Sequence, residues 1–204
     1  QWGIDFVNKL NGMFAIAIYD KTEGKLFLLR DRMGIKPLYF FYDEKDFIFS
    51  SEIKAILKIK RNLEINYSAL YAYLHLGYIP TSQTIYNEIF KLSPGTFLTH
   101  EKGIITHEFY WQIENKVSND VNQNFDKSKK ELKLLLQESI EKRLISDVPI
   151  GTFLSGGIDS SIVSAVAQEV NSSTINTFSI GFDDKKYNES VHAKKVAKYL
   201  GTNH

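Results

Sequence analysis

The chain has 204 residues, of which 43% are hydrophobic and 24% charged, a composition typical of folded domains. Its formal net charge of +1 excludes the strong positive field by which proteins recruit nucleic acid or anionic membranes. Because cysteine is absent, disulfides, thiolate metal sites and a cysteine nucleophile are excluded within these residues, and the composition fits a cytoplasmic protein.

The first half of the chain predicts a β-rich region with two short helices. Strands are predicted over residues 13–20, 25–31, 36–43, 46–51, 95–100 and 103–111, where aromatic and β-branched residues dominate. Gly24 lies in the turn between the first two strands and is able to take a positive φ. Ser51 is predicted to cap a helix over 52–58, and Ser68 is predicted to cap a helix over 68–76.

The second half predicts a parallel, doubly wound α/β sheet, because strand patterns alternate with amphipathic helix patterns. Residues 114–124 are polar and rich in asparagine, and they predict a linker before this region. Helices are predicted over residues 125–145, 158–170 and 190–200, and strands over 149–155 and 174–182. The predicted inward faces contain Leu132, Leu135, Leu136, Ile140 and Leu144 in the first helix and Ile158, Ile162 and Val166 in the second.

The stretch TFLSGGIDSSIVSAV places Ser155, Gly156 and Gly157 between a strand pattern and a helix pattern. A tight turn alone would use the same glycines. The context also fits a phosphate site, because the loop would lie at the carboxyl end of a buried strand and face a helix N-terminus. Asp159 fits a divalent cation that neutralises phosphate oxygens. The Walker lysine is missing, which argues against a P-loop kinase or GTPase.

The motif LSGGIDSS resembles the SGGxDS loop of ATP pyrophosphatases, enzymes that cleave ATP between its α- and β-phosphates. The resemblance implies an ATP and pyrophosphate site formed by Leu154, Ser155, Gly156, Gly157, Asp159, Ser160 and Ser161. It also implies that Asp159 holds Mg²⁺ and that Leu154 packs against the nucleotide. Ile180 matches the apolar position on the adenine side, although an ordinary core residue explains it equally well.

The first half narrows the choice among ATP pyrophosphatases. LNGMFAIAIYD, LLRDRMGIKPLYF and FSSEIKAIL resemble the amidotransferase domain of the N-terminal-nucleophile class. With IYNEIFKLSPGTFL, FYW, TFSIGF and YNESVHAKKVAKYLGTNH, the whole chain resembles glutamine-hydrolysing asparagine synthetase. One departure is Asn188, where that family usually has aspartate. We therefore expect an amidotransferase part over residues 1–112, a linker to about residue 124, and the start of an ATP pyrophosphatase domain over residues 125–204.

Asp31 lies between Arg30 and Arg32, and a solvated charge cluster is the simplest reading of such a run. The flanking arginines would keep the carboxylate ionised. By resemblance, Asp31 receives the α-amino group of glutamine. The family's nucleophile is a cysteine at the very N-terminus, so no catalytic residue is expected here, and we expect this stretch alone not to hydrolyse glutamine.

For the full-length protein, the resemblance implies ATP-dependent amidation of aspartate through β-aspartyl-AMP, with ATP and Mg²⁺ as cofactors and glutamine as nitrogen donor. The expected partners are these small molecules, without nucleic acid or membrane, and a homodimer is left open. Two alternatives remain at this point. One is a related amidotransferase that aminates a sugar or another carboxylate, and the other is a nucleotide-binding relative without catalysis.

Overall fold

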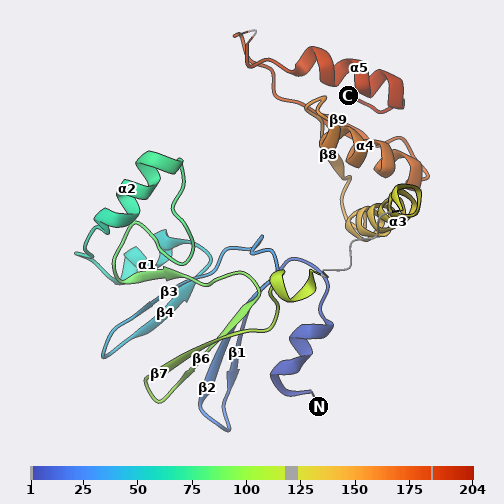
Figure 1. The fold of residues 1–204 in the computed structure, drawn as a ribbon. Coiled ribbons are helices and arrows are strands. Elements are labelled where there is room, and N and C mark those ends of the chain that lie inside the picture. The colour runs from blue at the N-terminus through green and yellow to red at the C-terminus, as the bar shows by residue number, and fades with distance from the viewer. Residues whose placement is uncertain (1, 118–123, 185) are drawn as a thin grey trace. The chain divides into compact units, whose positions relative to one another are not determined.

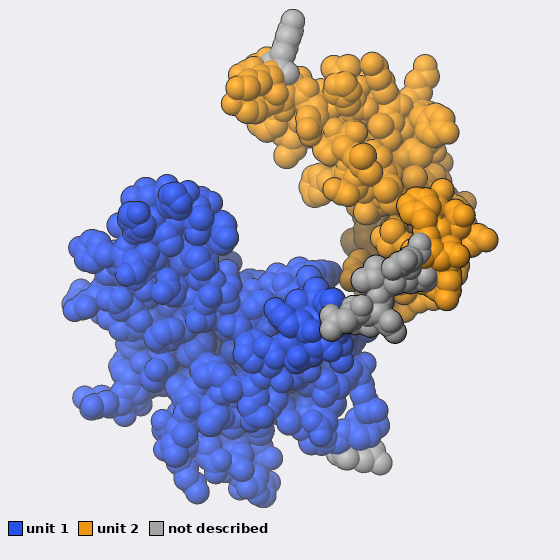
Figure 2. All heavy atoms as spheres, in the orientation of Figure 1, with its two compact units in different colours: residues 1–118 blue, residues 119–204 orange. Residues whose placement is uncertain are grey.

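The structure is a computed structural model that describes residues 2–117, 124–184 and 186–204. The chain divides into two compact units, residues 1–118 and 119–204 (Figures 1 and 2). Residues 118–123, which belong to the predicted linker, lie outside the described residues. Within the described ranges, no helix has both the length and the apolar character needed to cross a membrane.

Unit 1 contains two antiparallel sheets, which confirms the predicted β-rich region. The first sheet has the order β1 (Ala15–Asp20), β2 (Lys25–Arg30), β6 (Thr96–Glu101) and β7 (Ile104–Phe109). The second has the order β4 (Phe47–Ser50), β3 (Tyr39–Tyr42) and β5 (Ile89–Lys91). Leu28 and Leu98 of the first sheet share a buried cluster with Phe40 of the second, so the core lies between the sheets. Gly24 takes the expected positive φ of 66°.

The helices of unit 1 are found close to their predicted positions, but both predicted caps are wrong. Figure 1 shows α1 (Ile53–Ile59) and α2 (Tyr67–Leu76) beside the second sheet. The unit also contains two 3₁₀ helices, η1 (Gly3–Lys9) and η2 (Glu114–Lys116). Glu52 precedes α1 and its N–H donates to the Ser50 hydroxyl at 3.2 Å, so Ser51 is no cap. Asn66 caps α2 by accepting from the Ala69 N–H at 3.0 Å, which moves the helix start upstream of Ser68.

Unit 2 has the predicted order of helices and strands. The elements are α3 (Phe125–Arg143), β8 (Gly151–Phe153), α4 (Ile158–Val170), β9 (Asn176–Phe178) and α5 (Ser190–Leu200). β8 and β9 pair in parallel, and a parallel bridge from Asn176 to Asn203 continues the sheet beyond β9. The strands are shorter than predicted, because each pairs over only three residues.

The predicted inward helix faces of unit 2 are only partly correct. Ile140 of α3 packs with Val166 and Ala167 of α4, as the periodicity predicts. Contrary to prediction, the side chains of Leu132, Leu135, Ile158 and Ile162 are exposed. Ile158 lies in the first turn of α4, five residues beyond the paired end of β8 at Phe153.

Candidate functional site

The carboxylate of Asp31 holds the turn between β2 and β3. Its side chain is only 1% exposed. Oδ1 accepts the N–H groups of Met33 at 3.2 Å and Ile35 at 2.9 Å. Oδ2 accepts those of Phe14 at 3.3 Å and Lys36 at 2.9 Å. Four backbone donors therefore meet the roughly four lone-pair sites of one carboxylate.

These four donors favour the ionised form of Asp31. Burial alone would raise the pKa of Asp31, but the four backbone N–H groups outweigh it and hold the pKa below its ordinary value of 3.8. The charge of Arg30 acts in the same direction, because the Arg30 guanidinium and the Asp31 carboxylate attract each other. The predicted contact between Asp31 and the α-amino group of glutamine stays a prediction.

Arg30 binds two carbonyl groups of the same turn and one carbonyl that follows β5. The residue is 4% exposed, and its guanidinium donates to the carbonyls of Lys36 at 2.8 Å, Leu92 at 2.5 Å and Gly34 at 2.5 Å. Gly34 has a φ of 64°, and a Cβ there would lie 2.8 Å from Pro94 Cγ. The turn therefore requires both the buried arginine and the glycine.

Two later motifs meet this turn in space. The backbone carbonyl of Asp31 accepts the N–H of Gly95 at 3.0 Å, and the Tyr110 hydroxyl donates to the carbonyl of Arg30 at 2.7 Å. Gly95 has a φ of 63°, and a Cβ there would collide with the Trp111 carbonyl oxygen. Burial raises the pKa of Tyr110 to about 12, so its hydroxyl remains a donor at neutral pH. The LSPG and FYW motifs thus support the Asp31 turn, a role that sequence reasoning missed.

An open cavity of about 540 Å³ lies over this turn. Met13, Phe14, Ala15, Lys36, Pro37 and Ser51 line it. Phe14 and Lys36 also donate their N–H groups to Asp31, so the carboxylate lies directly behind the cavity wall. Asp31 places a negative charge behind this wall, while Lys36 in the lining and the buried Arg30 next to Asp31 carry positive charges.

In unit 2, the loop between β8 and α4 is shaped by its two glycines. Gly156 has a φ of 86°, and a Cβ there would lie 2.8 Å from His192 Cβ and 2.9 Å from the Ala193 nitrogen. A Cβ on Gly157 would meet only the Ser155 hydroxyl at 3.4 Å. The loop therefore packs against the start of α5 at its first glycine and stays open at its second.

The N-terminus of α4 has no side-chain cap. The N–H of Ser161 donates to the carbonyl of Gly157 at 3.0 Å. The N–H groups of Ile158, Asp159 and Ser160 have no acceptor among residues 2–117, 124–184 and 186–204. Such groups, with the partial positive charge of the helix end, form an anion site. The predicted binding of phosphate at this loop stays a prediction.

The serine hydroxyls of this loop are bonded within the protein. The hydroxyl of Ser161 donates to the carbonyl of Gly157 at 2.6 Å. The hydroxyls of Ser155 and Ser160 lie 2.8 Å apart, and the Gly157 N–H donates to Ser155 Oγ at 3.3 Å. These side chains shape the loop in this structure, and a bound phosphate would have to compete for their hydrogen bonds.

Three further predicted site residues differ in their exposure. Leu154 is fully buried against Ala193 and Ala197 of α5, so its side chain belongs to the core. Ile180 follows β9 and is 68% exposed, so it is no ordinary core residue. Asp159 is exposed in the first turn of α4.

A cation at this loop would need ligands from outside the protein chain. Over the described residues, no group of three or more His, Asp or Glu side chains is gathered for a metal ion. One exposed carboxylate fits Mg²⁺ that takes its other ligands from substrate phosphates and water.

Each of the two units matches a known family model. Residues 1–111 match the family model for the glutamine amidotransferase domain, and residues 131–204 match the model for asparagine synthase. A protein of Methanocaldococcus jannaschii assigned as glutamine-hydrolyzing asparagine synthetase 2 is 42% identical over 210 residues, covering 99% of this chain and 40% of its own length. Glutamine-hydrolyzing asparagine synthetase 1 of Bacillus subtilis is 37% identical over 195 residues, covering 95% of this chain and 30% of its own.

A more distant relative is also assigned as a glutamine-hydrolyzing asparagine synthetase. Glutamine-hydrolyzing asparagine synthetase B of Escherichia coli is 28% identical over 218 residues, covering 99% of this chain and 33% of its own length. The chain thus spans between 30% and 40% of the length of these relatives.

Proposed function

Because the chain belongs to the glutamine amidotransferase domain family, we propose that the whole protein transfers the amide nitrogen of glutamine to the side-chain carboxylate of aspartate, with cleavage of ATP. The match of residues 131–204 to asparagine synthase supports this acceptor. The observation that carries the proposal is the glycine loop after the parallel strand β8, which faces the uncapped N-terminus of α4.

In unit 2, the main-chain N–H groups at the start of α4 would bind the phosphates of ATP. The aspartate carboxylate would attack the α-phosphorus, giving β-aspartyl-AMP and pyrophosphate. Ammonia would then attack the acyl carbon and release AMP. Asp159 would hold Mg²⁺, which when bound supplies positive charge to the pyrophosphate oxygens. Ile180 would contact the adenine, since its exposed side chain is available to a ligand.

In unit 1, the open cavity over the Asp31 turn would hold glutamine. The buried charge of Asp31 would attract the α-amino group through the cavity wall formed by Phe14 and Lys36. Because each unit matches a family model, we also assign residues 1–112 to an amidotransferase domain and residues 125–204 to an ATP pyrophosphatase domain.

The test is pyrophosphate release by the full-length protein with ATP, measured with and without aspartate and with either glutamine or ammonium as nitrogen source. We expect release that depends on aspartate and asparagine formation with both nitrogen sources. Release without aspartate dependence would reject aspartate as the acceptor and point to another carboxylate or a sugar. No ATP turnover and no ATP binding would reject the proposal for the loop itself.

A further inference from the structure

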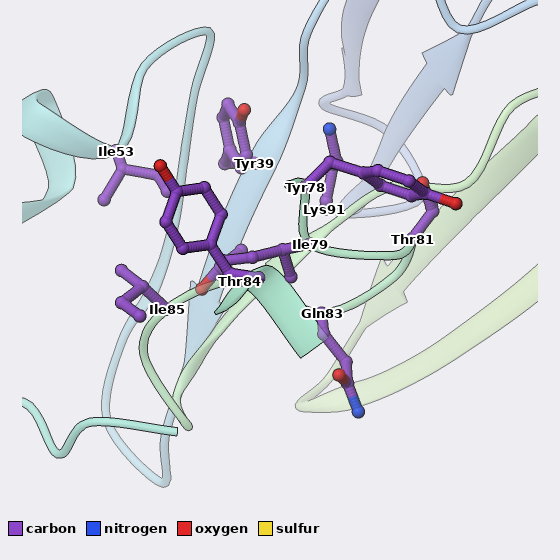
Figure 3. A pocket seen from close by; sticks show the side chains of 10 residues that line it. Tyr39, Ile53, Tyr78, Ile79, Thr81, Gln83, Thr84, Ile85 and Lys91 are labelled. Atoms are coloured by element: carbon purple, nitrogen blue, oxygen red, sulfur yellow. The ribbon is translucent and has the colours of Figure 1, made fainter. Parts of the chain in front are cut away.

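A second cavity in unit 1 lies apart from the residues of the proposed glutamine cavity. It has a volume of about 420 Å³, within the range of small-molecule sites. Tyr39 and Lys91 contribute from the second sheet, Tyr73 from α2, and Tyr78, Thr81 and Gln83 from the loop after α2. Figure 3 shows the Lys91 side chain between the rings of Tyr39 and Tyr78 in this view.

The walls of this cavity are tied in place by hydrogen bonds. The buried hydroxyl of Thr84 donates to the carbonyl of Ile89 at 2.7 Å. The Lys91 N–H donates to the Ser82 carbonyl at 2.9 Å, and the Asn66 N–H donates to the Ile85 carbonyl at 2.9 Å. The loop is thereby attached both to β5 and to the cap of α2. A ligand would therefore meet a preformed site and would not have to order the loop.

Lys91 gives the cavity an uncompensated positive charge. It lies opposite Tyr39 in the pairing of β3 with β5, so the two side chains share one face of the sheet. Its Nζ lies 5.9 Å from the centre of the Tyr39 ring, and in the described part of the chain no carboxylate lies within 4.0 Å of it. Burial first, and then the charge of Arg30, lower the pKa of Lys91. Lys91 is partly buried, and its ammonium is free to pair with a bound anion in a charge-assisted hydrogen bond.

We propose that this cavity binds a small aromatic carboxylate, with its ring against the tyrosines and its carboxylate paired with Lys91. The aromatic faces favour a planar ligand, and the absence of acidic residues from the lining favours an anion. Thr81 and Gln83 supply hydrogen-bonding groups for a polar substituent on the ring. This cavity lies outside the sites proposed for the amidation, and its binding of a ligand does not depend on that reaction.

The test compares three probes of matched shape on the 204-residue chain: 4-hydroxybenzoate, neutral 4-hydroxybenzamide and cationic 4-(aminomethyl)phenol. Binding is followed by NMR titration of backbone amides and tyrosine rings. We expect saturable binding of the anion, weaker binding of the amide and least binding of the amine, with shifts around Tyr78 and Lys91. Equal affinities for the three probes, or no saturable binding, would reject the proposal.

Substitutions in the cavity test where the carboxylate and the aromatic ring of the ligand bind. Lys91→Gln should weaken binding of 4-hydroxybenzoate by at least about tenfold, as expected for the loss of a charge-assisted hydrogen bond, and remove its advantage over the amide. Lys21→Gln, at an exposed lysine in the β1–β2 turn, is the matched control and should change nothing. Because Lys91 also borders a smaller neighbouring cavity, Tyr78→Leu and Phe109→Leu separate the two, since each residue lines only one of them. Weakening by Phe109→Leu but not by Tyr78→Leu would contradict the assigned position.

Discussion

Replacing Asp31 by asparagine tests whether the buried carboxylate holds the turn between β2 and β3. Asparagine is almost the same size but offers one carbonyl oxygen with two lone pairs, whereas the carboxylate accepts four N–H groups. At least two backbone donors would lose their acceptor. At about 1–3 kcal/mol for each unsatisfied group, we expect Asp31→Asn to lower the free energy of unfolding of unit 1 by about 2–6 kcal/mol.

Urea unfolding followed by tryptophan fluorescence is the suitable assay, because both tryptophans, Trp2 and Trp111, belong to unit 1. Asp5→Asn is the matched control, since Asp5 is exposed. A loss of stability in Asp31→Asn no larger than in Asp5→Asn would refute the assigned role.

The pH dependence gives a second check on the same residue. The pKa of Asp31 is lowered from 3.8, so its stabilising contribution is present above that value and is lost as the pH falls toward the folded-state pKa. The difference in stability between the native chain and Asp31→Asn should therefore be constant near neutral pH and narrow below about pH 4. A difference that is unchanged by acid would contradict an ionised carboxylate in the fold.

Three further predictions concern the glycines and the acidic residue of the two sites. Gly34→Ala should destabilise unit 1 by more than Gly103→Ala. Both glycines have a positive φ, but only a Cβ at Gly34 would collide with Pro94. Urea unfolding of the two variants measures the difference in stability. In the full-length protein, Gly156→Ala should weaken ATP binding far more than Gly157→Ala, because only a Cβ at Gly156 would collide with α5. Calorimetric titration with ATP measures the two affinities, and equal losses of affinity would contradict the loop geometry. Asp159→Ala should lower aspartate-dependent pyrophosphate release by roughly 100-fold, about 3 kcal/mol, if its carboxylate holds the cation, while the unfolding transition stays unchanged because the side chain is exposed.

Local patterns were sufficient to predict most of the elements. Alternating aromatic and β-branched residues around Gly24 predicted the β1–β2 hairpin, and the change to helical periodicity predicted the parallel pair β8 and β9. β5 was missed because its three residues carry no periodic signal and are a strand only through pairing with β3. The cap of α2 was misplaced by two residues, since Asn66 and Ser68 are both good caps and only the backbone geometry selects one.

The sequence by itself determined the order of strand, glycine loop and helix at Ser155–Ser161, because strand and helix periods and glycine positions are local properties. Only the tertiary structure decided what Arg30 and Asp31 do. Arg30 reaches the carbonyl of Leu92, 62 residues away, and its own carbonyl accepts from Tyr110, 80 residues away. These partners are backbone carbonyls and a distant hydroxyl, whose positions follow from the packing of two sheets. Arg30 and Asp31, which the sequence pattern places at a solvated strand end, are therefore buried, and they support the turn beside the proposed glutamine cavity.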